Sequence, residues 1–468
     1  MNRSKKLGIL LGILVIACIA TFAVMQMEER KEQIRNSEEI ILEISSDTVQ
    51  SLYWEYEGNT LAFHKAETWL YDEDEAFPVS EERILDLLEP FEAFGVSFVI
   101  EDVEGYGQYG LDDSLCTINL ATEEQSWKIL AGDYSKMDSK RYVSIGDGNV
   151  YLVQNDPLND FDTDLRNIID NDETPDFERV SKIAFSGEET YTILYTEDSA
   201  DTYSSEDVYF AQQGGKSLPL DTNKVGSYLQ NISYLNPADY VSYNADEAEL
   251  AAYGLDTPDL TITVDYIAED EDGVEYADTL VLHISRDPEE KKAAAEKNND
   301  EDSEEETITA YARVGESQII YNLSSSRYQN LMAAAYDDLR HSEVLWADFG
   351  DIQQIDISLE GSDYTIHSEK DGDERVYTYQ DEELEIKDFK AALEALTADS
   401  FTNERSTQKE EVSLTVYLDN ENYPQISIKL YRYDGTHCLA VVDGEPVSLI
   451  ERTDVVDLIE AVHAIVLN

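Results

Sequence analysis

Three glycines have the spacing of a nucleotide-binding loop. Gly105, Gly107 and Gly110 match Gly-x-Gly-x-x-Gly and come after Val96–Ile100, which alternates like a strand. In dinucleotide-binding proteins the last glycine opens a helix whose N-terminus holds the pyrophosphate. Here Leu111–Leu120 is short and alternating, which predicts a strand rather than a helix. We therefore predict no nucleotide site at this loop, and the sequence indicates no other cofactor.

The other reactive side chains lack catalytic spacing. His437 and Cys438 are adjacent, but neighbours in a strand point to opposite faces, so they do not predict a nucleophile and its base. The sequence contains neither His-Glu-x-x-His nor Gly-x-Ser-x-Gly. Pairs of carboxylates are uninformative because 101 residues are acidic. We therefore name no catalytic residue.

One acidic loop approaches the calcium-binding pattern of an EF-hand. Gly273 can take the glycine position, and Asp270 and Asp272 then fall on ligand positions. The first and last ligand positions, however, are occupied by Ala268 and Thr279. The loop fails as an EF-hand. Whether the chain binds a metal ion is left open.

The charge of the chain excludes one large class of partner. Its formal net charge is -68, from 33 basic and 101 acidic residues. Binding of nucleic acid needs a basic surface, so we predict no nucleic-acid partner. Cys116 and Cys438 could pair with each other, but cysteines in strand-like segments more often behave as small buried apolar residues.

The N-terminus predicts a membrane anchor. Leu7–Met25 carries no charge and, at about 1.5 Å per residue, can cross a hydrocarbon core of roughly 30 Å. Arg3, Lys5 and Lys6 precede it, which places the N-terminus in the cytoplasm. Cys18 and the three residues before it instead resemble a lipobox, whose cysteine is lipidated after cleavage. Both alternatives predict a single-pass or lipid anchor in the cell membrane and an extracytoplasmic body.

The body contains three similar copies of one pattern. Each copy begins with two alternating stretches joined by a glycine turn, the pattern of a β-hairpin. A further strand and an amphipathic helix follow, and each copy closes with a strand, a tight turn, a strand and a final helix. The hairpin turns contain Gly58, Gly187 and Gly361, and the first helix stripes are Ile84, Leu87, Leu88 and Phe91, then Val225, Tyr228, Leu229 and Ile232, then Ile386, Phe389, Leu393 and Leu396.

The predicted fold class is α+β. We expect tandem domains, each an antiparallel β-sheet with one or two packed helices, after a single N-terminal transmembrane helix. Within the second domain, residues 287–307 have a dense acidic tract without apolar periodicity, which predicts a disordered insertion. The predicted segments are the anchor 1–27, a juxtamembrane linker 28–46, and α+β repeats at 47–172, 176–343 and 344–468, the third being divergent.

One four-residue motif is shared by the first two copies. Tyr109, Gly110, Leu111 and Asp112 recur as Tyr253, Gly254, Leu255 and Asp256. The glycine allows a positive φ at a sharp turn, the leucine can enter the core, and the aspartate can accept from nearby backbone N–H groups. The motif therefore predicts a structural role.

The paired motifs, a predicted turn at Gly132-Asp133 and the N-terminal anchor resemble the bacterial family called domain of unknown function 4340 (DUF4340). The third copy lacks the motif and has Ser406–Glu411 in its place. Proteins similar to this one accompany ABC-type exporters, so the resemblance implies an accessory role at a transporter.

The sequence thus favours a non-enzymatic, extracytoplasmic binding or scaffold subunit, accessory to an ABC-type exporter. Two alternatives from other classes remain open, a hydrolase of the cell envelope and a cation-responsive surface adhesin. Neither the transported substrate nor the contact surface follows from the residues.

Overall fold

The computed structural model of the 468-residue chain describes residue 21 and residues 39–101, 103, 105–270, 273–296, 308–372, 374–405 and 408–466. The predicted anchor, which includes Cys18, and the linker as far as residue 38 lie outside the described residues, with the exception of Thr21. In the described part of the chain, no helix is both long and apolar enough to cross a membrane.

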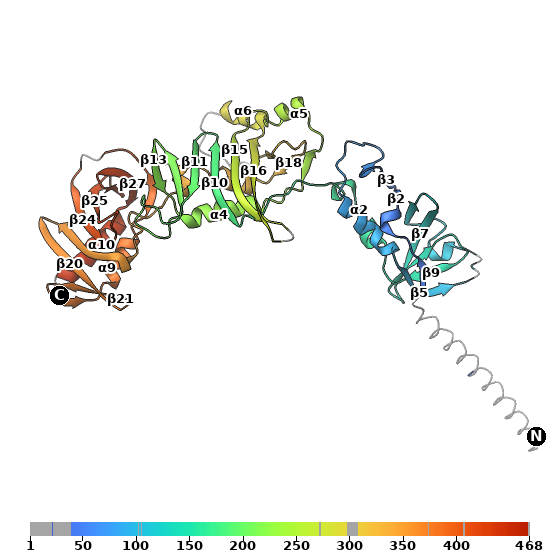
Figure 1. Cartoon of the computed structure of the whole chain (residues 1–468), viewed down its shortest axis with the longest axis horizontal. Coiled ribbons are helices and arrows are strands. Elements are labelled where there is room, and N and C mark those ends of the chain that lie inside the picture. Colours follow the sequence, from blue (N-terminus) through green and yellow to red (C-terminus); the bar gives the residue numbers. More distant parts are fainter. Residues whose placement is uncertain are drawn as a thin grey trace, which may run out of the picture. The chain divides into compact units, whose positions relative to one another are not determined.

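The fold is α+β and contains three antiparallel sheets of nine strands each (Figure 1). The first sheet belongs to a compact unit that ends at Asn171, and the second and third sheets belong to a compact unit of residues Asp172–Asn468. Tandem sheet domains are therefore the architecture of the chain, as the repeated sequence pattern predicts.

The first sheet has the strand order β1-β5-β9-β8-β7-β6-β2-β3-β4. Its strands are β1 (Glu39–Leu42), β2 (Ser51–Tyr56), β3 (Asn59–Lys65), β4 (Trp69–Tyr71), β5 (Phe94–Ile100), β6 (Cys116–Ala121), β7 (Ser126–Ser135), β8 (Lys140–Ser144) and β9 (Val150–Val153).

The second and third sheets have identical connectivity, β13-β12-β11-β10-β15-β16-β17-β18-β14 and β22-β21-β20-β19-β24-β25-β26-β27-β23. The strands of the second are β10 (Arg179–Ser186), β11 (Thr190–Tyr195), β12 (Tyr209–Gln213), β13 (Lys216–Pro219), β14 (Tyr240–Ser242), β15 (Leu260–Glu269), β16 (Glu275–Arg286), β17 (Ala310–Val314) and β18 (Ile320–Leu323). Those of the third are β19 (Ile352–Leu359), β20 (Ser362–Asp371), β21 (Glu374–Tyr379), β22 (Glu382–Leu384), β23 (Ala398–Phe401), β24 (Glu410–Leu418), β25 (Gln425–Arg432), β26 (His437–Val442) and β27 (Glu445–Glu451).

One topology underlies all three sheets. A run of hairpins leads to a helix and an edge strand, and a second run of hairpins returns so that its first strand pairs with the first strand of the copy. These central pairs are β2 with β6, β10 with β15, and β19 with β24. The first sheet differs by the additional strand β1 and by the lack of a strand equivalent to β13.

The first helix of each copy packs on one face of its sheet, whereas α5 packs on the opposite face of the second sheet, where Leu250 lies against Tyr311 and Ile320. In the second sheet, Val225 and Ile232 of α4 are buried with Ile183 and Val264 of the central strands. The helices are α2 (Glu81–Leu88), α3 (Leu158–Phe161), α4 (Thr222–Ser233), α5 (Glu247–Ala252), α6 (Pro288–Glu296), α7 (Ser325–Met332), α8 (Tyr336–Leu339), α9 (Lys387–Glu394) and α10 (Arg452–Val466), with short 3-10 turns η1 (Ser46–Thr48), η2 (Glu89–Phe91), η3 (Gly107–Tyr109), η4 (Leu165–Asn167) and η5 (Phe349–Asp351).

The first helix of each copy follows from local sequence signals. Ser80 is the N-cap of α2 and accepts from the Arg83 N–H, 3.4 Å away. Ile84, Leu87 and Leu88 are buried, so the apolar stripe faces the core as its spacing indicates.

Four local expectations differ from the structure. The predicted linker contains β1, which is held by pairing with β5. The predicted insertion is helical over Pro288–Glu296, where Asp287 accepts from the first free N–H groups, and residues 297–307 lie outside the described residues. A final helix around Leu165 is only the single turn η4. Gly132 lies inside β7, at an irregularity in its pairing with β8, instead of in a turn.

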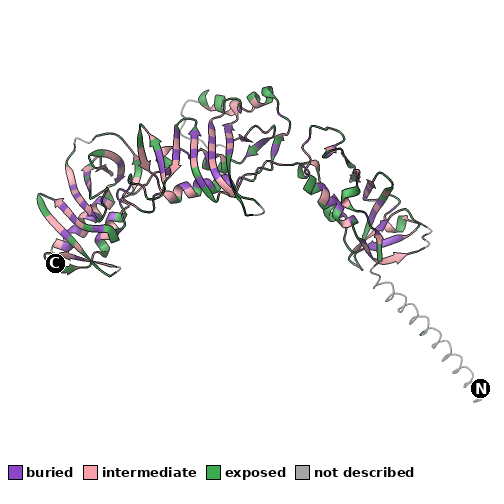
Figure 2. Ribbon diagram, viewed as in Figure 1, coloured by how far each residue is buried: buried purple, intermediate pink, exposed green. Residues whose placement is uncertain are grey.

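The face of each sheet opposite its first helix is polar and partly open; in the second sheet α5 covers part of it, at Tyr311 and Ile320. Figure 2 shows buried and less buried residues alternating along the strands. In the second sheet Asp265 accepts from Lys182 and from Thr279, at 3.2 and 2.9 Å, across three strands. In the third sheet Asp356 accepts from Thr365 at 2.8 Å. These half-exposed ladders of hydroxyl and charged groups are a repeated feature of the chain.

Candidate functional site

A loop of the second sheet carries a buried polar cluster. Residues 196–208 join β11 to β12, and their Tyr203 packs against the apolar core of the third sheet. Its ring lies 4.7 Å from that of Trp346 and 5.8 Å from that of Tyr423. Burial raises the pKa of the Tyr203 phenol well above its ordinary value. The loop therefore ties the second sheet to the third.

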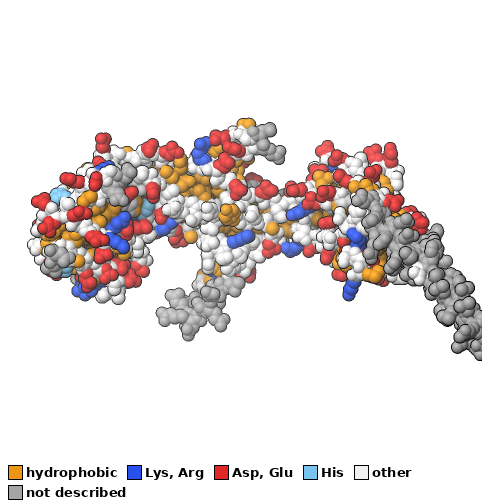
Figure 3. Space-filling model, turned by 90° about the horizontal axis from the view of Figure 1, so that it is seen from below, with side chains coloured by type: hydrophobic (Ala, Val, Ile, Leu, Met, Phe, Trp, Pro, Cys, Tyr) orange, Lys and Arg blue, Asp and Glu red, His pale blue; other side chains and the backbone are white. Residues whose placement is uncertain are grey.

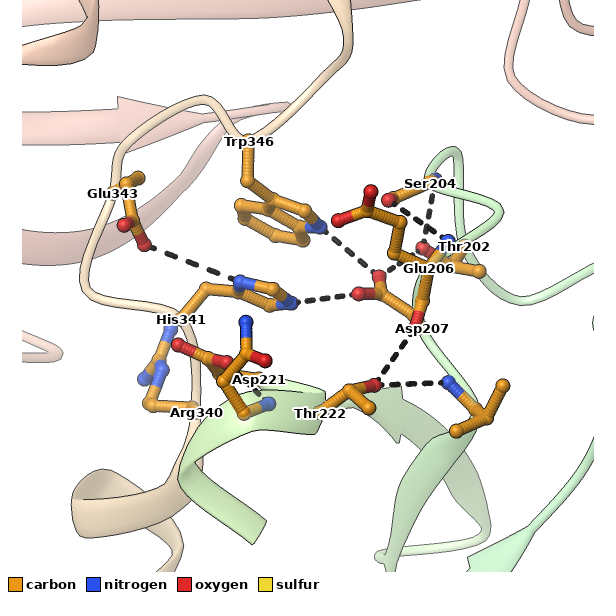
Figure 4. A network of polar contacts seen from close by, with 12 residues as sticks. Thr202, Ser204, Glu206, Asp207, Asp221, Thr222, Arg340, His341, Glu343 and Trp346 are labelled. Carbon is orange, nitrogen blue, oxygen red and sulfur yellow. Dashed lines mark hydrogen bonds and ion pairs between the residues drawn. The ribbon is translucent and has the colours of Figure 1, made fainter. Parts of the chain in front are cut away.

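Asp207 lies at the end of this loop and is 3% exposed. Its carboxylate accepts from Thr202 Oγ1 at 2.5 Å, from Trp346 Nε1 at 3.1 Å and from the ring of His341 at 3.0 Å. A buried carboxylate is costly unless it is hydrogen-bonded, and these three donors meet that requirement. Figure 4 shows the donors converging on Asp207 from the loop and from the segment before the third sheet.

The partners of His341 determine which ring nitrogen is free to act. Nε2 faces the Asp207 carboxylate, which can only accept, so Nε2 carries the hydrogen. Nδ1 lies on the other side of the ring, 4.0 Å from Glu343 Oε2. The ring itself is stacked on Trp346. These contacts fix the orientation of His341.

Asp221 completes the group. It is the N-cap of α4, and one carboxylate oxygen, Oδ1, accepts from the N–H groups of Asn223 and Lys224. Ligand atoms of Asp221, His341 and Glu343 all lie within 4.8 Å of one another. These side chains line an open hollow of about 370 Å³ together with Asp207 and others. One imidazole and two carboxylates are a donor set that suits a divalent cation.

The shared Tyr-Gly-Leu-Asp motif ends the 3-10 turn η3 in the first copy and the helix α5 in the second. Gly254 follows α5 with φ +74°. Its N–H donates to Ala251 O at 3.2 Å, and the N–H of Leu255 donates to Leu250 O at 2.8 Å. This is a Schellman motif, in which glycine takes the left-handed position. Gly110 does the same after η3, with φ +70°.

The remaining motif residues anchor that turn to the sheet. Leu111 and Leu255 are 4% and 3% exposed. The ring of Tyr109 lies 5.0 Å from Tyr142 of β8, and the ring of Tyr253 lies 4.7 Å from Tyr311 of β17. The motif aspartates are Asp112 and Asp256; the carboxylate of the latter accepts from the neighbouring Thr257 hydroxyl at 3.3 Å, where the sequence predicts a backbone donor.

Comparison with models of protein families gives two matches to one description, "Domain of unknown function (DUF4340)", over residues 69–210 and 212–415. Together they cover well over half of the chain. The chain belongs to the DUF4340 family. No curated protein matches it.

The boundaries of the two DUF4340 matches do not coincide with the boundaries of the three sheets. The first begins at β4 of one sheet and ends within β12 of the next, and the second continues into β24 of the third. Asp207 therefore falls in the first match, whereas Asp221, His341 and Glu343 fall in the second.

The other residues that the sequence singles out in this DUF4340 chain are not members of the cluster. Cys116 and Cys438 are free, buried thiols, and burial raises the pKa of each to about 12. Gly110 is the left-handed residue that ends η3, and the next element after Gly105, Gly107 and Gly110 is the strand β6, so these glycines open no α-helix. Gly273 lies in the β15–β16 hairpin.

Sequence reasoning missed the Asp207–His341 pair. No sequence motif links these two residues, because they are 134 positions apart in the chain. The tripeptide His341-Ser342-Glu343 recurs as His367-Ser368-Glu369 on β20. Only the first occurrence lies outside a strand and beside a helix N-cap.

Proposed function

We propose that this chain is a non-enzymatic, membrane-anchored extracytoplasmic subunit that binds or scaffolds partner proteins beside an ABC-type exporter. The N-terminal apolar run Leu7–Met25 and the basic residues before it support the anchor and its orientation. Cys18 offers a lipid anchor as the alternative attachment. In either case the three sheets face the extracytoplasmic side.

The observation that carries the proposal is the threefold occurrence of one sheet with an open polar face. The part of this face that no helix covers is available for contact, and hydroxyl and charged side chains there can make specific hydrogen bonds. Three such faces in one chain suit a protein that binds extended or multiple partners, because linked weak contacts add avidity.

The charge of the surface supports partners with complementary basic groups. Figure 3 shows Asp and Glu side chains spread over the visible face, with fewer Lys and Arg. With 101 acidic and 33 basic residues, long-range attraction favours a basic partner surface and disfavours other acidic proteins.

Site-specific photo-crosslinking of the full-length chain in its native membranes tests this function. A photoreactive residue is placed at Thr263 of β15 or at Thr415 of β24, which are half-buried positions of the open faces. Matched control positions are Glu82 of α2 and Gln230 of α4, both exposed on helices. Cross-linked partners are identified by mass spectrometry.

We expect the sheet positions to capture a subunit of an exporter and the helix positions to capture little. If none of the four positions yields an exporter component, the accessory role is wrong. Capture from the helix positions alone would contradict the assignment of the open sheet faces as the contact surface.

A further inference from the structure

The cluster around His341 has a feature that scaffolding does not require. Its imidazole is held by the buried Asp207 carboxylate at Nε2, and Nδ1 lies 4.0 Å from Glu343 Oε2. Ligand atoms of His341, Glu343 and Asp221 lie within 4.8 Å of one another. Metal-binding histidines very often donate their second N–H to a carboxylate in this manner, because that bond fixes the ring and makes the ligating nitrogen more basic.

We propose that Asp221, His341 and Glu343 bind a divalent transition metal ion, with zinc as the best fit. His341 coordinates through Nδ1, and Asp207 supports it through Nε2. Asp221 contributes the carboxylate oxygen that does not cap α4. The ion joins the start of α4 to the segment that leads into the third sheet, so it closes the junction of these two sheets.

The donor set selects the type of ion. Calcium and magnesium prefer six or more oxygen ligands, whereas zinc accepts one imidazole and two carboxylates and keeps its fourth position for water. Zinc–ligand bonds of about 2.0–2.2 Å place tetrahedral ligand atoms roughly 3.4 Å apart. The ligand atoms of Asp221, His341 and Glu343 are up to 4.8 Å apart in the structure, so binding of the ion draws these side chains together. Glu343 has room to move because its side chain is 39% exposed.

The charges around the cluster favour a cation. Glu206 and Glu394 also line the hollow. Two basic residues that neighbour the cluster in sequence are engaged elsewhere. Lys224 Nζ donates to the Arg340 carbonyl at 2.9 Å, and the Arg340 guanidinium lies over the Phe401 ring and 3.4 Å from Asp337. A divalent ion therefore neutralises an excess of carboxylates at the junction.

The test is zinc titration of the purified full-length chain by calorimetry, in the presence of excess magnesium to occupy weak acidic sites. The variants Asp221→Asn, His341→Gln and Glu343→Gln each remove one ligand. Asparagine preserves the helix cap, and glutamine at 343 changes an exposed side chain, so both variants keep the fold. Tryptophan fluorescence is recorded in parallel, because His341 is stacked on Trp346.

The matched control is His367→Gln, since His367 stands in the same tripeptide but lies exposed on β20. We expect one zinc ion per wild-type chain, a fluorescence change at Trp346, binding weaker by about tenfold or more in each ligand variant, and no change in the control. The proposal is overturned if the wild type binds no stoichiometric zinc, or if folded Asp221→Asn and Glu343→Gln bind it as the wild type does.

Discussion

The imidazole of His341 lies parallel to the indole of Trp346, with ring centroids 4.3 Å apart and planes inclined by 6°. Both rings donate to the buried carboxylate of Asp207. Two residues that precede the third sheet are therefore fixed to one loop residue of the second sheet. This relationship is one of the contacts that join the second and third sheets within one compact unit.

Replacing Trp346 by phenylalanine keeps an aromatic ring and removes the Nε1 donor. The buried Asp207 carboxylate then loses one of its hydrogen bonds, and we expect the free energy of unfolding of the second unit to fall by about 1–3 kcal/mol. Denaturant unfolding followed by circular dichroism measures the change. Trp127→Phe on β7 of the other unit serves as the control, and an equal loss in both variants would contradict the role of Asp207.

Buried tyrosines make the stability of the fold sensitive to alkaline pH. Burial raises the pKa of Tyr377 to about 12, while an unfolded phenol titrates near 10. Between these values the unfolded state binds fewer protons than the folded state, so the free energy of unfolding decreases as pH rises from about 10 towards 12. Below pH 10 this contribution is fully present.

The variant Tyr377→Phe isolates that effect. It loses the hydrogen bond to Phe349 O, 2.6 Å long, which costs about 0.5–1.5 kcal/mol at neutral pH. Above pH 10 its stability should decline less steeply than that of the wild type. Unfolding curves at several pH values measure the slope, with Tyr276→Phe, 47% exposed, as the control. Identical slopes for Tyr377→Phe and the wild type would rule the effect out.

The left-handed glycine of the shared motif should not tolerate a side chain. Gly110 has φ +70°, and a Cβ atom there would lie 2.6 Å from the Asp133 carboxyl carbon. We expect Gly110→Ala to lower the unfolding free energy by more than the about 1–2 kcal/mol that the backbone conformation alone costs. Thermal unfolding provides the measurement.

Gly226 is the matched control for that substitution. It lies inside α4, and a Cβ atom there would meet nothing within 4 Å. We expect Gly226→Ala to stabilise the chain by about 0.5–1 kcal/mol, because alanine favours the helix. Destabilisation of similar size by both substitutions would contradict the assignment of the strain to the turn.

The two buried thiols should be inert in the folded chain. Burial raises the pKa of Cys116 and Cys438 to about 12, so almost no reactive thiolate exists at neutral pH. In a Cys18→Ser variant, alkylation by iodoacetamide should be negligible until guanidinium is added, after which both thiols react. Mass spectrometry counts the modified sites. Rapid alkylation under native conditions would show that these strands open.

The sequence by itself determined the features that depend on neighbouring residues. Strand alternation, the helix stripe beginning at Ile84, the Ser80 cap and the recurrence of Tyr-Gly-Leu-Asp are local signals. The antiparallel sheets, each with an amphipathic helix packed on it, follow from them. The family resemblance rested on the same motif. Local signals were weakest where a strand forms only because it pairs with a distant one. An example is the short edge strand β1, which pairs with β5.

The tertiary structure alone decided the candidate site. His341-Ser342-Glu343 and His367-Ser368-Glu369 are the same tripeptide, and nothing local separates them. His367 lies exposed on β20, while His341 meets Asp207 and lies close to Asp221. The N–H of Asp221 donates to Leu339 O, so packing of α8 beside the start of α4 brings distant residues together. Such contacts depend on how whole elements pack, and the order of residues along the chain does not specify them.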